Sequence, residues 1–424
     1  MSFPFEQELT ERFLRYVAIT SQSDASAGVV PSTPGQWDMA KTLQSELSNL
    51  GLVDIELSEY CVLTAKLPSN TDKQLPAIGF CAHPAIGFCA HLDTVDVNLN
   101  PNITAQLVHY TGGDICLNEA DQIYIRLAEH PELEAYINDD IFVSDGHSVL
   151  GADDKASVAS IMTALHYLQQ HPDVQHGDIH VAFVPDEEIG LVGAKHMNFE
   201  KFPVDFAYTL DCCGIGEVVY ETFNAGSASI HIKGVSAHPM SAKGVLVNPT
   251  LVAVDFINQF NRLETPENTD GTDGYIWVQA MNSNQSTATV TLNIRDHHRD
   301  RYEAKKVYIE EAVTFIQKRY PRAQITLHMT DVYGNIKDTL TEENKFCVDY
   351  IYQAMDILGI TPITLAMRGG TDGSYISTKG IPTPNFFTGA HNFHSNAEFL
   401  PIKSFVKSCE MILTIIDLVT KQTK

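Results

Sequence analysis

The 424-residue sequence has few basic residues. It holds 28 lysines and arginines against 53 aspartates and glutamates, which gives a formal net charge of -25. A chain this acidic repels phosphate backbones and anionic lipid surfaces, so neither nucleic acid nor a membrane is an expected partner. Carboxylates that bind cations would explain part of the acidic excess, because their charge remains in the count until the metal is added.

Long apolar runs and paired cysteines are also missing. No stretch approaches the ~18 apolar residues needed to span a bilayer, and the first residues, MSFPFEQELTERF, show no basic and apolar signal pattern. The eight cysteines form no C-x-x-C pair, which predicts buried, reduced thiols. These absences predict a cytoplasmic protein.

One octapeptide is present twice. PAIGFCAH occupies residues 76–83 and again 84–91. The repeated octapeptide is far shorter than the ~20 to ~50 residues of a structural repeat unit, so the duplication indicates a local insertion. Only the second copy is followed by Asp93, so only His91 forms an H-x-D unit. A proline follows the first copy and cannot lie inside a central strand. We therefore expect a buried strand at 85–90, with the first copy displaced upstream.

The first half of the chain alternates amphipathic helical patterns with short apolar runs. Three of these runs end in acidic or histidine residues, namely AIGFCA, IHVAFV and FAYTL. Continuous apolar runs are typical of parallel strands that are buried on both faces. The site of such an α/β sheet lies beyond the carboxyl ends of its strands.

From about residue 223 the pattern changes to strand, helix, strand, helix, strand, which is typical of an α+β unit with an antiparallel sheet. We therefore expect an α/β catalytic domain over 1–222 and 335–424, with a mixed, mainly parallel sheet flanked by helices. The segment 223–334 is expected to form an inserted α+β domain that acts as a lid or a dimerisation domain. The sequence leaves the oligomeric state open, with a homodimer as one alternative.

Acidic and histidine residues gather in five motifs: HLD (91–93), GADDK (151–155), PDEEIG (185–190), LDCC (210–213) and HNFHSNAEF (391–399). Taken singly, each has an ordinary explanation, such as a structural histidine or a helix N-cap. Together they place charges at apolar strand ends, where unpaired burial is costly and a divalent cation relieves the cost. The set fits a two-metal hydrolase, which activates water between its ions. Mixed histidine and carboxylate ligands suit zinc, with cobalt or manganese as substitutes.

In order and spacing, these motifs, together with GVSAHPMSAKG and MRGGTDGS, resemble those of a clan of metal-dependent hydrolases. The clan includes aminoacylases, carboxypeptidase and succinyl-diaminopimelate desuccinylase. Within it, the chain is most similar to the peptidase T family of tripeptide aminopeptidases, over nearly its whole length. The resemblance implies an enzyme that removes the N-terminal residue of tripeptides with two zinc ions per subunit.

The resemblance also implies a set of metal ligands. His91 and Asp211 would bind one zinc ion, and Glu188 and His394 would bind the other. Asp153 would bridge the two ions.

Three further residues have implied catalytic roles. Asp93 would accept a hydrogen bond from the imidazole of His91 and orient it. Glu187 would be the general base that takes a proton from the bridging water and passes it to the leaving amine. His238 would stabilise the tetrahedral oxyanion, with a turn histidine before a proline as the alternative.

Arg295 and Arg368 are candidates for binding the C-terminal carboxylate of the substrate, because a guanidinium suits bidentate recognition. Arg295 could equally be a surface residue. Cys212 and Cys213 follow Asp211 where the family usually has glycines, so the local backbone geometry stays open.

Three functions follow from these observations. The first is the tripeptide aminopeptidase. The second keeps the site but acts on a dipeptide or an N-acyl amino acid. The third is a catalytically inactive metal-binding protein, against which the presence of Glu187 argues.

Overall fold

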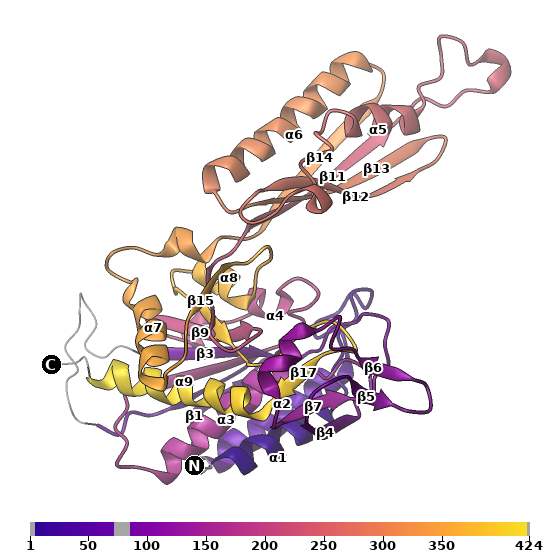
Figure 1. The fold of residues 1–424 in the computed structure, drawn as a ribbon. Helices are drawn as coiled ribbons and strands as arrows, with labels where there is room; N and C mark the ends of the chain where they lie inside the picture. Colours follow the sequence, from indigo (N-terminus) through magenta and orange to yellow (C-terminus); the bar gives the residue numbers. More distant parts are fainter. Residues whose placement is uncertain (1–4, 72–84, 422–424) are drawn as a thin grey trace. The chain divides into compact units, whose positions relative to one another are not determined.

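The structure, a computed structural model, describes residues 5–71 and 85–421. The chain forms two compact units, shown in Figure 1. Unit 1 comprises Met1–Tyr220, Leu340–Leu365 and Thr371–Lys424, and unit 2 comprises Glu221–Thr339 and Ala366–Gly370. The segment 223–334, expected to be a separate domain, lies within the residues of unit 2.

An eight-stranded sheet forms the centre of unit 1, with the order β1-β2-β8-β3-β9-β16-β10-β15. The central strands β8, β3, β9 and β16 are parallel, whereas β1 pairs antiparallel with β2, β2 with β8, and β10 with β16. The strands are β1 (Val53–Leu57), β2 (Leu63–Leu67), β3 (Ile86–His91), β8 (Ile179–Val184), β9 (Phe206–Cys212), β10 (Glu217–Glu221), β15 (Ile363–Ala366) and β16 (Asn385–Phe387).

Alternate residues of a strand point to opposite faces of the sheet, and helices cover both of these faces. In β3, Phe88 packs in the main hydrophobic cluster and Cys89 in a second, smaller one. The main cluster holds residues of α1 (Glu6–Val17), α2 (Pro34–Asn49), α3 (Ala152–Gln170), α7 (Phe346–Leu358) and α9 (Ile402–Lys421). The smaller one holds residues of α4 (Val192–Lys195) and α8 (Asp372–Ser377).

Two small sheets complete unit 1, in the orders β17-β7-β4 and β5-β6. They share a separate hydrophobic cluster that includes Tyr136 and Phe399. Their strands are β4 (Ala105–Tyr110), β5 (Ile115–Asn118), β6 (Ile123–Ile125), β7 (Asp139–Ser144) and β17 (Phe399–Pro401). Five short 3-10 helices lie in the described parts of both units, at Pro131–Tyr136, Phe199–Lys201, Pro239–Ser241, Pro266–Asn268 and Ile336–Thr339.

Unit 2 is a four-stranded antiparallel sheet with two helices. The strand order is β12-β13-β11-β14. The helices α5 and α6 share a hydrophobic cluster with the sheet. The elements are β11 (Asn224–Lys233), α5 (Pro249–Ile257), β12 (Tyr275–Ser283), β13 (Thr287–Asp296), α6 (Arg299–Arg319) and β14 (Gln324–Tyr333). The predicted fold class, a mixed α/β unit plus an antiparallel α+β unit, is confirmed.

The strand expected at 85–90 is β3, which spans Ile86–His91 and is buried throughout. His91 is therefore the last residue of a central strand. The first octapeptide copy, 76–83, lies outside the described residues. Within the described part of the chain, no helix is long and apolar enough to cross a membrane.

Candidate metal centre

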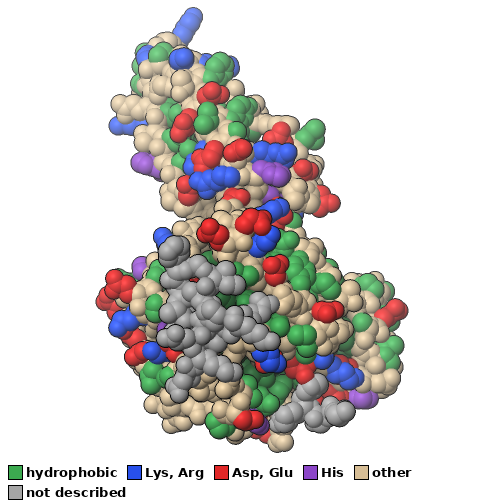
Figure 2. Space-filling view, turned by 90° about the vertical axis from the view of Figure 1, so that its left-hand side faces the viewer, with side chains coloured by type: hydrophobic (Ala, Val, Ile, Leu, Met, Phe, Trp, Pro, Cys, Tyr) green, Lys and Arg blue, Asp and Glu red, His purple; other side chains and the backbone are tan. Residues whose placement is uncertain are grey.

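The face in Figure 2 shows acidic and basic side chains interspersed over the described surface. A more concentrated group of acidic residues lies at the carboxyl end of the parallel strands in unit 1. His91 ends β3, Asp211 is the penultimate residue of β9, and Glu187 and Glu188 follow β8. Since these strands are parallel neighbours, their carboxyl ends meet at one edge of the sheet.

Two further residues reach this edge from other elements. Asp153 lies in the first turn of α3, where its φ and ψ of -79° and 102° are not helical. His394 lies in the loop between β16 and β17, with a left-handed φ of 61°. A non-glycine residue in this region carries backbone strain, and such strain gathers at functional sites.

The side chains of these residues converge on one another. Nε2 of His91 lies 2.9 Å from Oδ1 of Asp153, and Nε2 of His394 lies 3.0 Å from Oδ2 of the same carboxylate. Three groups have ligand atoms that all lie within 4.8 Å of one another: His91, Asp153 and Asp211; Asp153, Glu188 and His394; and His91, Glu187 and Glu188. Asp153 belongs to two groups and turns one oxygen to each histidine, which fits a bridging carboxylate.

Asp93 supports this cluster in two ways. Nδ1 of His91 lies 3.0 Å from the backbone oxygen of Asp93 and 3.5 Å from its carboxylate. The carboxylate itself accepts hydrogen bonds from the backbone N–H groups of Glu187 and Glu188, at 3.0 and 3.2 Å. Asp93 therefore orients His91 mainly through its carbonyl group, and its carboxylate fixes the adjacent glutamates.

Two buried carboxylates in the same region were not singled out from the sequence. Asp154 accepts a hydrogen bond from the backbone N–H of His91 at 3.1 Å. Glu398 accepts three, from the backbone N–H groups of Leu150, Gly151 and Asp153, at 2.7 to 3.0 Å. The only sequence signal for them was their place in the motifs GADDK and HNFHSNAEF.

Burial raises the pKa of Glu187 and Asp211 well above the usual range, and neighbouring carboxylates raise it further. The pKa of Glu188 rises to about 7 through burial and the charge of Asp153. Hydrogen bonds to Asp153 and Glu188 raise the pKa of His394 to about 11. In the absence of a metal, these shifts bring protons to a cluster that has too much negative charge.

The residues fit divalent cations. Among the described residues, no lysine or arginine forms an ion pair with Asp153, Glu187, Glu188 or Asp211. Oε1 of Glu188 is buried and lies 3.0 Å from Nε2 of His394. Oxygen and imidazole donors that converge in this way match the ligand set of zinc and related ions.

The remaining predicted site residues, His238, Arg295 and Arg368, lie in unit 2. His238 is exposed, and its Nδ1 accepts a hydrogen bond from the backbone N–H of Met240. Arg295 donates to the backbone oxygens of Gly226 and Ile294. These side chains therefore have partners inside unit 2, and their roles toward a substrate stay predictions.

Arg368 holds a loop of unit 2. It donates hydrogen bonds to Oγ1 of Thr269 and to the backbone oxygens of Gly271 and Asp273, at 2.7 to 3.2 Å. Its guanidinium also lies over the rings of Phe223 and Tyr275. These contacts give Arg368 a structural role.

Neither cysteine after Asp211 belongs to the three groups of converging ligand atoms among the described residues. Burial raises the pKa of Cys212 and Cys213. The backbone N–H of Cys213 donates to a carboxylate oxygen of Glu217 at 2.9 Å, and the backbone oxygen of Cys212 accepts from Thr388. The backbone after Asp211 is thus held by hydrogen bonds where the family usually has glycines.

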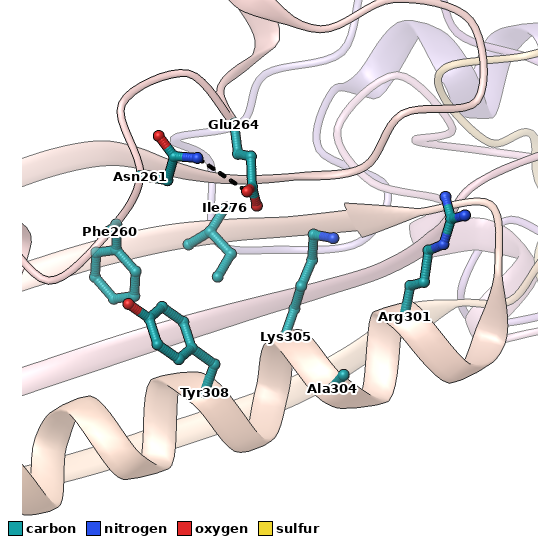
Figure 3. Close-up of a pocket in the computed structure, with 8 residues that line it drawn as sticks. All are labelled: Phe260, Asn261, Glu264, Ile276, Arg301, Ala304, Lys305 and Tyr308. Atoms are coloured by element: carbon teal, nitrogen blue, oxygen red, sulfur yellow. Dashed lines mark hydrogen bonds between the residues drawn. The ribbon is translucent and has the colours of Figure 1, made fainter.

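A cavity of about 380 Å³ lies in unit 2, and Figure 3 shows the side chains that line it. It lies between α6 and the start of β12, and its lining includes Phe260, Glu264, Arg301 and Lys305. None of the predicted site residues lines it, so the cluster at the end of β3, β8 and β9 is the better candidate for catalysis.

Comparison with known proteins places these features in a family. The model of Peptidase family M20/M25/M40 matches residues 144–418. A Peptidase T-like protein of Yersinia pestis is 51% identical over 98% of both chains. Peptidase T of Fusobacterium nucleatum is 43% identical over 97% of both chains.

Solved structures share the fold. The chain superposes on aminopeptidase PepT from Bacillus cereus with a TM-score of 0.73 and 22% identity, covering 98% of this chain and 99% of that one. A tripeptidase from Staphylococcus aureus gives a TM-score of 0.72 at the same identity and coverage.

Proposed function

Because the chain belongs to Peptidase family M20/M25/M40, we propose that it is a metal-dependent aminopeptidase that releases the N-terminal residue of tripeptides. The observation that carries this proposal is the convergence of five donor residues in the arrangement that the motifs imply. Relatives of more than 40% identity that are named Peptidase T support the choice of substrate.

We assign the ligands as the family resemblance implies them. His91 and Asp211 would hold one ion, Glu188 and His394 would hold the other, and Asp153 would be shared by both. Zinc is the proposed metal, with cobalt or manganese as substitutes. When bound, two such ions lower the pKa of a shared water and polarise the carbonyl group of the scissile bond.

Residues of the chain supply the remaining chemistry. Glu187 takes a proton from the attacking water and passes it to the leaving amine. Asp93 keeps Glu187 in place through the hydrogen bond to its backbone N–H.

The roles of unit 2 belong to the proposal as well. His238 is the candidate donor to the oxyanion, and Arg295 and Arg368 are candidates for the carboxylate of the substrate. The contacts of Arg368 with the 269–273 loop make it the weaker of the two arginines. We further propose that the enzyme acts in the cytoplasm.

The test is a substrate profile with purified enzyme and zinc. We expect release of alanine from trialanine, and far slower turnover of dialanine and N-acetylalanine. Preferential turnover of dialanine or of N-acetylalanine would replace the proposal by the dipeptidase or the deacylase. No hydrolysis of any of the three by a fully metal-loaded protein would favour a non-catalytic metal-binding protein.

A further inference from the structure

The chain passes through a left-handed residue between β8 and the two glutamates of the site. In an extended strand, adjacent side chains point to opposite faces of the sheet. Glu187 and Glu188 are adjacent, yet both have a carboxylate oxygen within 4.8 Å of a ring nitrogen of His91. Asp186, just before them, has a φ of 57°, and the backbone oxygen of Glu187 accepts from the N–H of Gly190 at 2.9 Å. The turn that starts at Asp186 therefore brings both glutamates to the same cluster.

Two residues at the amino-terminal end of α2 hold Asp186 in this conformation. A residue with a Cβ atom is strained in the left-handed region, and it stays there only where its surroundings fix it. Asp186 is fully buried. Its carboxylate accepts hydrogen bonds from the backbone N–H and the hydroxyl group of Ser32, at 2.7 and 2.5 Å, and from Nε2 of Gln36 at 2.6 Å.

Gln36 binds the backbone of Asp186 as well as its side chain. Oε1 of Gln36 accepts a hydrogen bond from the backbone N–H of Asp186 at 2.9 Å. A side-chain amide carries a donor and an acceptor side by side, so it can bind both groups of one residue at once. Gln36 is itself fully buried, and loss of these contacts would leave polar groups without partners away from water. The two hydrogen bonds of Gln36 fix the backbone of the turn at its first residue.

The segment before α2 also holds the loop that follows His91. Oγ of Ser21 donates to the backbone oxygen of Leu92 at 2.7 Å. The backbone N–H of Thr94 donates to the backbone oxygen of Ser21 at 3.2 Å. The same part of the chain therefore supports the loop after His91 and, through Gln36, the turn after β8.

We propose that Gln36 is a positioning residue for the general base. This inference rests on the proposed function and deepens it. Gln36 acts through Asp186, whose left-handed conformation sets the directions of Glu187 and Glu188. The carboxylate of Asp93 holds the backbone N–H groups of the same two glutamates, so the turn is fixed from two sides.

The position of Glu187 matters for the rate. A general base must lie within hydrogen-bond reach of the water that it activates. A displacement of about 1 Å, caused by a change away from the chemistry, can lower the rate about a hundredfold. Glu188 lies in the same turn and is an assigned metal ligand, so a shift of the turn should also weaken the binding of one zinc ion.

The test changes the polar groups between positions 36 and 186. Gln36→Glu keeps the length of the side chain, but it removes the donor and places a second carboxylate against that of Asp186. At saturating zinc, we expect kcat for trialanine to fall about ten- to a hundredfold, with a smaller change in KM. Zinc titration of the metal-free variant should show weaker binding of one ion.

A second substitution should reverse these effects. In the double variant of Gln36→Glu with Asp186→Asn, the side-chain amide of residue 186 donates to the carboxylate of residue 36. That carboxylate can still accept the backbone N–H of residue 186, so both contacts are restored with donor and acceptor exchanged. We expect most of the lost kcat and zinc affinity to return.

Gln317→Glu is the matched control. Gln317, in α6 of unit 2, also donates through Nε2, to the backbone oxygens of Tyr320 and Ala323, and its Oε1 accepts the backbone N–H of Ile325. Its replacement should lower the free energy of unfolding, measured by chemical denaturation, but it should leave kcat and zinc affinity unchanged.

The assignment would be overturned if Gln36→Glu kept the native kcat and zinc affinity, if Asp186→Asn restored neither, or if Gln317→Glu caused the same losses. If Gln36→Glu does not fold, Gln36→Asn takes its place, because its shorter side chain cannot reach both groups of Asp186. Native kcat and zinc affinity in that variant contradict the proposal. None of these results affects the proposed function, which fails only if the native enzyme does not cleave trialanine.

Discussion

In unit 2, the buried carboxylate of Asp296 lies 2.7 Å from Nζ of Lys305, whereas the buried carboxylates of the metal centre in unit 1 face histidines and one another. Burial of a charge without a partner is costly in either unit. Unit 2 meets this cost with a cation of its own chain. In unit 1, the negative charge of these carboxylates is left for a bound cation to balance, which is typical of a metal site.

Removal of the metal should have the largest effect on activity and on the stability of unit 1. A chelator should abolish hydrolysis and lower the stability of unit 1, because the cluster of carboxylates then loses its counter-charge. At a thousandfold excess of free zinc over its Kd, binding adds about 4 kcal/mol to the free energy of unfolding. Activity assays and calorimetry with and without added zinc measure both effects. An apo enzyme with unchanged stability would show that the cluster needs no cation.

The next effect concerns Glu187. Glu187→Gln removes the proton acceptor but keeps the shape of the side chain, so kcat should fall by about 10² to 10⁴-fold. Zinc content should remain near that of the native enzyme, because Glu187 is not one of the assigned ligands. Parallel loss of zinc and activity would instead make Glu187 a ligand, as its place in a group with His91 and Glu188 allows.

Glu398→Gln tests whether the carboxylate of Glu398 helps to hold the proposed metal ligand Asp153 in place. The variant replaces a carboxylate that accepts three backbone N–H groups around Asp153 by an amide with one acceptor oxygen. Outer partners of this kind typically contribute 10- to 100-fold to metal affinity, so zinc should bind about that much more weakly. Zinc titration of the apo enzyme measures the change, and an unchanged affinity would show that the 150–153 turn holds its position without Glu398.

Lys305→Met should affect stability alone. The change leaves the carboxylate of Asp296 buried and unpaired, at a cost of about 3 to 5 kcal/mol in the free energy of unfolding. Zinc affinity should not change, because unit 2 supplies none of the assigned ligands. Asp296→Asn with Lys305→Met should recover part of the loss, and chemical denaturation of the two variants gives the difference. Equal stability of native enzyme and Lys305→Met would remove the contrast between the units.

Sequence and structure agree most closely where a pattern has one physical solution. The apolar run before His91 predicted a buried central strand, and β3 starts and ends within one residue of it. The change of pattern near residue 223 predicted an antiparallel α+β unit, because alternating apolar residues suit a sheet with one buried face. The motifs also pointed to the residues that converge at the carboxyl ends of the strands.

Contacts made through the backbone could not be read from the sequence. Glu398 and Asp154 bind main-chain N–H groups of segments far away in the chain, and no spacing rule reveals such a partner. The sequence predicted that the carboxylate of Asp93 orients His91; in the structure that carboxylate lies 3.5 Å from Nδ1 of His91 and also accepts from the amides of Glu187 and Glu188, which the sequence did not reveal. The sequence also held no sign of the contacts of Arg368 with the 269–273 loop and with Phe223 and Tyr275.

The central claim is that two divalent ions complete the site in unit 1. Its most direct test is to titrate the metal-free enzyme with zinc while bound zinc and trialanine hydrolysis are measured in the same samples. The account predicts that hydrolysis reaches its maximum when two zinc ions are bound per chain, and that the His91→Ala and His394→Ala variants each bind one ion fewer. Full hydrolysis by the metal-free enzyme, or zinc binding that both variants retain in full, would contradict it.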